Sequence, residues 1–186
     1  MKKFSKDLET LFYEQKILPI VNSKNLSDDI KIIESLLNSN KSIKCIEITL
    51  REENSFINAI KLKERFSHIH FGLGSILNLE MLEKSTNENF DFYVSPGLIP
   101  EIISKNLNNY IPGAETVSDF NFLYNEGFNL IKFFPATISG GPAKIKAVQN
   151  IYKNLKFIPT GGLNKLNMNE YLNLANVLCV GMSKFN

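Results

Sequence analysis

The feature of this sequence that most restricts its fold is an alternation of short apolar runs with amphipathic segments, which continues along nearly the whole chain. Eight apolar runs have the length and composition of β-strands, and they begin roughly every 20 to 27 residues. This spacing fits a strand, a crossover helix and two short loops, so the strands are expected to pair in parallel. The predicted strands are 17–21, 43–50, 69–74, 90–95, 110–112, 129–134, 156–159 and 177–181.

The segments between these strands carry apolar residues at helical spacing. A short amphipathic helix is also expected ahead of the first strand, over residues 4–15. Ser27 precedes a run with one apolar face and is the predicted N-cap of the next helix. The later predicted helices are 56–66, 79–84, 99–107, 117–126, 143–151 and 168–174.

Eight such units can close a (β/α)8 TIM barrel, and this is the predicted fold. A doubly wound open sheet is the alternative, but no Gly-rich dinucleotide-binding fingerprint follows the first predicted strand. The 186 residues fit one domain, 1–186, although they are few for such a barrel. Because the sequence stops five residues after Gly181, we expect a barrel shortened at its C-terminus, with the final helix missing.

Charge and cysteine content limit the classes of partner. A formal net charge of +2, with 22% charged residues, gives no electrostatic reason to expect nucleic acid or a membrane, so a small molecule is expected instead. Cys45 and Cys179 each lie in an apolar run, which favours buried free thiols in a reducing compartment over a disulfide. His68 and His70 form no ligand spacing with them, so no metal site is predicted. No apolar stretch is long enough to span a bilayer, and the cytoplasm is the expected location.

The predicted strand 129–134 contains one lysine, Lys132, among apolar residues. Strand residues alternate between two faces, so Phe134 shares the side of Lys132, while Ile131 and Phe133 point the other way. Burial removes solvation from an ammonium and lowers its pKa, which makes a neutral, nucleophilic amine available for Schiff-base chemistry. The alternative is a lysine near a strand end whose ammonium reaches water, since lysine is rarely buried.

The predicted strand 43–50 has an unusual polar face. Glu47, Thr49 and Arg51 alternate with aliphatic residues, so the polar groups should face the barrel interior. Buried charges need partners, and an internal Glu47–Arg51 pair would be the simplest structural explanation. The other interpretation is that these groups belong to a site at the carboxyl ends of the strands, where barrels carry their reacting groups.

Several predicted strands end in small residues or turn residues. Segment 72–75 would let a ligand approach the backbone and offers the Ser75 hydroxyl, whereas 95–97 and 112–113 also fit ordinary turns. The last two strands end in 159–162, with Gly161 and Gly162, and in 181–183, with Ser183. Barrels often bind phosphate with the loops after strands seven and eight, so this pair of loops favours a phosphate site, with a flexible turn as the alternative for the two glycines.

Taken in order, these motifs resemble those of the 2-keto-3-deoxy-6-phosphogluconate (KDPG) aldolase and 4-hydroxy-2-oxoglutarate aldolase family. The resemblance covers nearly the whole chain, and its specificity lies in the order of the set, because each motif alone is common. The motifs are Glu47-Ile48-Thr49-Leu50-Arg51, Gly72-Leu73-Gly74-Ser75, Ser95-Pro96-Gly97, Ile111-Pro112-Gly113, Lys132-Phe133-Phe134-Pro135-Ala136, Gly140-Gly141 and Pro159-Thr160-Gly161-Gly162.

The resemblance implies a (β/α)8 barrel that assembles as a homotrimer and works without a metal or other cofactor. It implies that Lys132 forms the imine with the substrate ketone and that Glu47 acts as general acid and base. Arg51 and Ser75 would hold the pyruvoyl carboxylate. The remaining substrate-binding positions implied are Pro96, Phe134 and Thr160, with Gly161, Gly162 and Ser183 at the phosphate.

The sequence departs from the family pattern in three places. Family members commonly have threonine at the position of Ser75, so the hydroxyl is retained. Many have arginine near Asn22, so one anion contact is missing here. The family also continues beyond the segment around Ser183 with helices that complete the phosphate site, which leads us to expect weaker phosphate binding and lower stability.

The leading functional hypothesis is a class I aldolase that cleaves KDPG, a keto-acid sugar phosphate, to pyruvate and glyceraldehyde 3-phosphate, with 4-hydroxy-2-oxoglutarate as a second substrate. Two alternatives stay open. One is an aldolase for the galactonate-derived epimer, and the other is a degenerate, non-catalytic barrel that only binds a sugar phosphate or keto acid. Retention of Lys132, Glu47 and Arg51 together argues against the second, because a binding protein needs no nucleophile.

Overall fold

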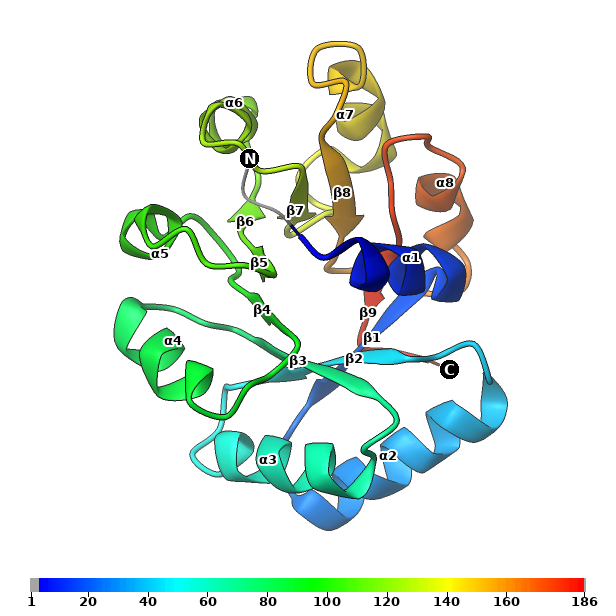
Figure 1. Cartoon of the computed structure of the whole chain (residues 1–186). Helices are drawn as coiled ribbons and strands as arrows, with labels where there is room; N and C mark the ends of the chain where they lie inside the picture. Colours follow the sequence, from blue (N-terminus) through cyan, green and yellow to red (C-terminus); the bar gives the residue numbers. More distant parts are fainter. Residues whose placement is uncertain (1–3, 186) are drawn as a thin grey trace.

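A computed structural model of the chain describes residues 4–185 and contains two all-parallel sheets. The larger sheet has the order β5-β4-β3-β2-β1-β9, and the smaller has the order β6-β7-β8. Their strands are arranged around a common centre (Figure 1). The strands are β1 (Ile17–Asn22), β2 (Cys45–Thr49), β3 (His70–Gly74), β4 (Phe92–Val94), β5 (Tyr110–Ile111), β6 (Gly113–Ala114), β7 (Leu130–Phe133), β8 (Lys156–Pro159) and β9 (Val180–Met182).

Helices alternate with the strands, as the sequence predicts. All except α1 lie outside the strands, whereas α1 lies across one end of them (Figure 1). The helices are α1 (Lys6–Gln15), α2 (Leu26–Ser39), α3 (Ser55–Arg65), α4 (Leu79–Thr86), α5 (Pro100–Ser104), α6 (Val117–Asn125), α7 (Gly141–Val148) and α8 (Met168–Leu172). No helix among the described residues combines the length and the apolar character needed to cross a membrane.

The structure has two short strands where the sequence predicts one over 110–112, and the second lies beyond the predicted end. Pro112 separates β5 from β6, so nine strands are present among the described residues where the sequence predicts eight. Proline has no backbone N–H to donate to a sheet ladder, which explains the interruption. Its carbonyl still accepts a hydrogen bond from the N–H of Lys132, at 2.9 Å. At the other side of the smaller sheet, isolated parallel bridges join Phe157 to Val177 and Thr160 to Gly181.

The start of α2 differs from the prediction. Asn25, and not Ser27, is the N-cap, and its side-chain oxygen accepts hydrogen bonds from both the N–H and the hydroxyl of Ser27 at 2.9 Å. Asparagine and serine are about equally good caps, so composition alone does not decide between two candidates that are two residues apart.

The apolar residues form two clusters. The larger lies between the strands and the surrounding helices and includes Ile46, Ile48, Ile131 and Phe133. The smaller, which we call the inner cluster, lies inside the strands at their amino ends beneath α1. The members of the inner cluster are Phe4, Leu8, Phe12, Leu18, Cys45, Phe92, Val94, Ile111, Leu130, Ile158, Leu178 and Cys179. Both cysteines are free and buried, and burial raises the pKa of the Cys45 thiol to about 12.

The inner cluster closes the amino ends of the strands. The Phe12 ring is fully buried and meets the edge of Phe92, with 5.1 Å between ring centroids. At the end of α1, the Gln15 amide accepts from the N–H of Cys45 at 2.9 Å and donates to the carbonyl of Ile17 at 2.8 Å. Gln15 thus joins the ends of β1 and β2 under α1, and the pocket described below opens at the opposite, carboxyl ends of the strands.

Candidate active site

The centre of the candidate site is a buried pair of charged residues from two sheets. Lys132 on β7 donates from Nζ to the two carboxylate oxygens of Glu47 on β2, at 3.0 and 3.4 Å. The exposed fractions of the two residues are 7% and 1%. The space for the carboxylate depends on Gly74, because a side chain there would collide with Glu47. Gly74 thus makes room for Glu47, while Ser75, at the end of the same segment, lines the pocket.

The alternation predicted for 129–134 is observed. Ile131 and Phe133 pack in the larger cluster, against the helices. Lys132 and Phe134 both line a pocket on the other side, and the Lys132 ammonium lies 5.9 Å from the centroid of the Phe134 ring. The ring face favours a nearby cation. The lysine therefore combines little contact with water, one carboxylate partner and one aromatic neighbour.

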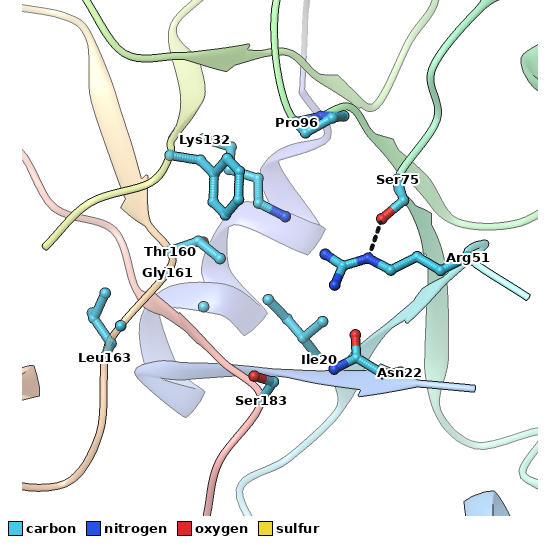
Figure 2. Close-up of a pocket in the computed structure, with 13 residues that line it drawn as sticks. Ile20, Asn22, Arg51, Ser75, Pro96, Lys132, Thr160, Gly161, Leu163 and Ser183 are labelled. Carbon is cyan, nitrogen blue, oxygen red and sulfur yellow. Dashed lines mark hydrogen bonds between the residues drawn. The ribbon is translucent and has the colours of Figure 1, made fainter. Parts of the chain in front are cut away.

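Arg51 has its own partner, so the simple explanation of an internal Glu47–Arg51 pair is wrong. Its Nε donates to the hydroxyl of Ser75 at 3.0 Å, and Figure 2 shows the two terminal nitrogens of the guanidinium turned into the pocket. Ser75 has a positive φ of 61°, a strained conformation for a non-glycine residue that tends to persist at functional sites. A planar group with two free nitrogens can bond both oxygens of a carboxylate at once.

The pocket has a volume of about 180 Å³ and opens at the carboxyl ends of the strands (Figure 2). Nine of the ten predicted site residues line it, and the tenth, Glu47, lies behind Lys132. These nine are Arg51, Ser75, Pro96, Lys132, Phe134, Thr160, Gly161, Gly162 and Ser183.

The loop after β8 lines the pocket with three consecutive residues, Gly161, Gly162 and Leu163. Gly161 and Gly162 have φ values of 97° and 79°, which strongly favour glycine. The carbonyl of Gly161 accepts from the N–H of Thr137, and the carbonyl of Gly162 accepts from the Asn167 amide at 3.1 Å. The N–H groups of Gly161, Gly162 and Leu163 have no partner within residues 4–185. Free N–H groups in a loop whose carbonyls are anchored are suited to an anion.

The turn that carries Pro96 is fixed by one buried hydroxyl. Ser95 Oγ bonds the carbonyl of Gly97 and the hydroxyl of Tyr110, both at 2.7 Å, and accepts from the N–H of Gly113 at 3.3 Å. Burial raises the pKa of Tyr110 to about 12, so this hydroxyl keeps its proton. The turn prediction for 95–97 is consistent with this geometry, and the turn holds Pro96 against the pocket.

A comparison with known families assigns the chain. The family model described as "KDPG and KHG aldolase" matches residues 8–186. The chain belongs to the KDPG and KHG aldolase family. This confirms the resemblance of the ordered motifs.

Relatives within this aldolase family cover most of the chain. It is 30% identical to the 2-dehydro-3-deoxy-phosphogluconate aldolase of Pseudomonas aeruginosa over 94% of this chain and 80% of that protein. It is 29% identical to the KHG/KDPG aldolase of Escherichia coli K12 over 98% of this chain and 86% of that protein. A crystal structure of the Legionella pneumophila KDPG aldolase, with pyruvate captured as a covalent carbinolamine intermediate, superposes with a TM-score of 0.86 and 31% identity, covering 93% of this chain and 84% of that one.

Four pocket residues of this family member were not predicted as site residues. They are Ile20, Asn22, Leu163 and Gly181. Their position in the sequence could have indicated them, because all four lie at the carboxyl end of a predicted strand or in the loop that follows it. Only the polar side chain, Asn22, brings hydrogen-bonding groups of its own.

Proposed function

We propose that this protein is a class I aldolase that cleaves KDPG to pyruvate and glyceraldehyde 3-phosphate through an imine on Lys132. The observation that carries the proposal is the buried Lys132–Glu47 pair, with 3.0 Å between Nζ and Oε1 at the floor of the pocket. Support also comes from the Legionella pneumophila relative, which was captured with pyruvate as a covalent carbinolamine. A protein that only binds keto acids has no use for a buried amine beside a proton acceptor.

The pair provides the proton transfers that the reaction needs. Glu47 takes a proton from the Lys132 ammonium, and the neutral Nζ attacks C2 of the substrate. Glu47 gives that proton to the carbinolamine hydroxyl, which leaves as water, and an iminium forms. The iminium then accepts the electron pair of the C3–C4 bond, while the Glu47 carboxylate takes the proton of the C4 hydroxyl. The aldehyde leaves, Glu47 returns a proton to C3 of the enamine, and water releases pyruvate. The iminium is the electron sink, so the proposed reaction uses no metal or other cofactor.

The remaining pocket residues divide between the two ends of the substrate. Arg51 and Ser75 hold the pyruvoyl carboxylate. Gly161, Gly162 and Ser183 take the phosphate through backbone N–H groups and a hydroxyl. Three further residues, Pro96, Phe134 and Thr160, form the walls between them. Two fixed ends place C2 of the substrate near Nζ, which is how remote binding energy contributes to rate.

We also propose that residues 1–186 form a single (β/α)8 barrel domain without the final helix. The division at Pro112 and the bridge between Thr160 and Gly181 support this, because they connect the smaller sheet to β5 on one side and to β9 on the other. No helix follows β9 within residues 4–185.

A homotrimer in the cytoplasm completes the proposal. Exposed apolar side chains stand on loops after strand ends, and two of these loops lie across the ring of strands from the third (Figure 1). The side chains are Leu77, Ile138 and Leu166, with exposed fractions of 60%, 83% and 94%. Each interface of a cyclic trimer joins two different surface patches, which fits apolar side chains on opposite sides of the ring of strands. Sedimentation at micromolar concentration should give three times the chain mass, and an active monomer would contradict the trimer.

The substrate test compares KDPG with its unphosphorylated analogue. The phosphate should raise kcat/KM by about 10- to 100-fold, the range expected for hydrogen bonds to a charged group. Equal values for the two substrates would leave a lyase that recognises only the pyruvoyl end. The name of the Escherichia coli relative, KHG/KDPG aldolase, favours 4-hydroxy-2-oxoglutarate as a second substrate for the same assay.

A further inference from the structure

Asn22 occupies a part of the pocket to which the proposed function gives no role. It ends β1, which pairs with β2 on one side and with β9 on the other. At the rim of the pocket it therefore lies between Arg51, which follows β2, and Ser183, which follows β9 (Figure 2). These neighbours belong to the proposed carboxylate end and the proposed phosphate end, so Asn22 faces the middle of the substrate chain.

The orientation of the Asn22 amide is fixed by a buried hydroxyl. Thr49, which lies opposite Asn22 in the β1–β2 register and is 1% exposed, donates to the Asn22 oxygen at 3.0 Å. With its oxygen held by Thr49, the amide offers its two N–H groups to the pocket. No hydrogen bond to another residue within 4–185 uses them. Figure 2 shows the amide nitrogen on the side of Ser183.

The backbone beside Asn22 is also anchored. The next residue, Ser23, donates its hydroxyl to Asp29 at 2.7 Å and accepts from the Asn58 amide at 3.1 Å. All three residues are buried, with exposed fractions of 7% or less. The loop that leads from β1 into α2 is thus tied to both α2 and α3, and the Asn22 donor has a fixed place.

We infer that Asn22 is a specificity-determining residue whose amide donates a hydrogen bond to the C5 hydroxyl of the substrate, which is the 2-hydroxyl of the aldehyde product. The inference rests on the proposed function. The C4 oxygen belongs beside the Lys132–Glu47 pair, where the C3–C4 bond breaks, and the charged ends are taken by Arg51 and the glycine loop. The C5 hydroxyl is the polar group left between the reacting centre and the phosphate. A neutral amide suits a neutral hydroxyl and adds no charge between two anions.

The test pairs a change in the protein with a change in the substrate. In the condensation direction, pyruvate is combined with glyceraldehyde 3-phosphate or with 3-oxopropyl phosphate, which lacks only the 2-hydroxyl. The wild-type protein should prefer the hydroxylated aldehyde by about tenfold in kcat/KM, the value of one net hydrogen bond. Asn22→Ala should bring the ratio close to one, while Lys24→Ala, an exposed change in the same loop, should keep the wild-type ratio.

Thr49 serves as a positioning residue in the same test. Thr49→Val should lower the preference because the amide can rotate, and Thr49→Ser should restore it because the hydroxyl returns. A general loss of folded protein would lower kcat/KM for both aldehydes equally and leave the ratio of the two values unchanged.

The outcomes separate the role of Asn22 from the proposed aldolase function. A tenfold preference in both wild type and Asn22→Ala, or no preference in wild type, overturns the role of Asn22 and leaves the aldolase intact. Borohydride trapping of pyruvate by the wild-type protein is measured alongside. Absence of trapping and of condensation overturns the proposed function, and the inference with it.

Discussion

The two ends of the strands are built in opposite ways. At the amino ends, α1 and the inner cluster fill the interior with aromatic and aliphatic side chains, and the Gln15 amide bonds backbone groups of Ile17 and Cys45. At the carboxyl ends, the interior holds a buried ion pair, an arginine directed into a pocket and a serine with positive φ. Apolar packing dominates the first end, and the second is open and polar.

This difference shows how the molecule separates stability from chemistry. A buried ion pair contributes little net stability because desolvation opposes its attraction, and a strained φ at Ser75 costs free energy. The closed end offsets such costs by burying apolar surface, at about 25 cal/mol per Å². Changes at the closed end should therefore lower the free energy of unfolding and leave the chemistry intact, whereas changes at the pocket end should do the reverse.

The largest effect is expected at the closed end. Phe12→Ala removes a fully buried ring that contacts Phe4 and Phe92, and should lower the free energy of unfolding by about 3–5 kcal/mol. Urea unfolding followed by circular dichroism measures the loss. The folded fraction should still react with pyruvate, because the ring lies at the end of the strands opposite Lys132.

The matched control is Tyr13→Ala, which removes the next side chain along α1, 67% exposed. It should change the free energy of unfolding by less than about 0.5 kcal/mol. Equal losses in the two variants would mean that burial under α1 does not set the stability of this end.

At the pocket end, Glu47→Gln separates imine formation from proton transfer. Glutamine keeps the shape and a hydrogen-bonding oxygen for Lys132 but cannot take up a proton. Imine formation with pyruvate should stay detectable, while exchange of the pyruvate methyl protons in D2O should slow by roughly 10² or more. Proton NMR of the methyl signal follows the exchange. Wild-type exchange rates in this variant would assign the base to another group.

The smallest effect concerns the pH dependence of the polar network beneath Asn22. Burial raises the pKa of Asp29 above its usual 3.8, and the hydrogen bond from Ser23 opposes the rise only in part. The folded state therefore holds a proton that the unfolded state releases near pH 3.8. This contribution to stability is complete below pH 3.8 and is lost as the pH rises through the raised pKa.

Asp29→Asn keeps an oxygen for Ser23 and cannot ionise. The free energy of unfolding of the wild type, relative to this variant, should fall as the pH is raised from about 4 to about 7. Urea unfolding at several pH values measures the difference. Parallel curves would show that the pKa of Asp29 is the same in the folded and unfolded states.

Local patterns of the sequence predicted much of the fold. Strand 156–159 was predicted with its observed bounds, and the inward direction of Glu47 and Lys132 followed from two-residue periodicity on their strands. These features depend only on which neighbours are apolar. Other features depend on one residue: Pro112 splits a strand because it lacks an N–H, and Asn25 takes the cap from Ser27.

The rest depends on contacts between residues far apart in the sequence. Glu47 and Lys132 are 85 positions apart in the sequence. Knowing that both are polar and point inward does not tell how far apart they lie in space. In the structure Glu47 pairs with Lys132, and Arg51 bonds Ser75 instead. The space that Gly74 leaves for Glu47, and the bond from Thr49 that orients Asn22, likewise exist only once neighbouring strands are in register.

The most direct test of the aldolase mechanism is reduction of the imine in place. The wild-type protein is incubated with pyruvate and sodium borohydride, digested, and its lysine-containing peptides are weighed by mass spectrometry. Lys132→Arg, which keeps a cation beside Glu47 but forms no imine, is treated in parallel. The mechanism predicts a stable pyruvate-derived adduct on Lys132 in the wild type and none in the variant. An unmodified Lys132, or an adduct on another lysine that persists in the variant, would contradict it.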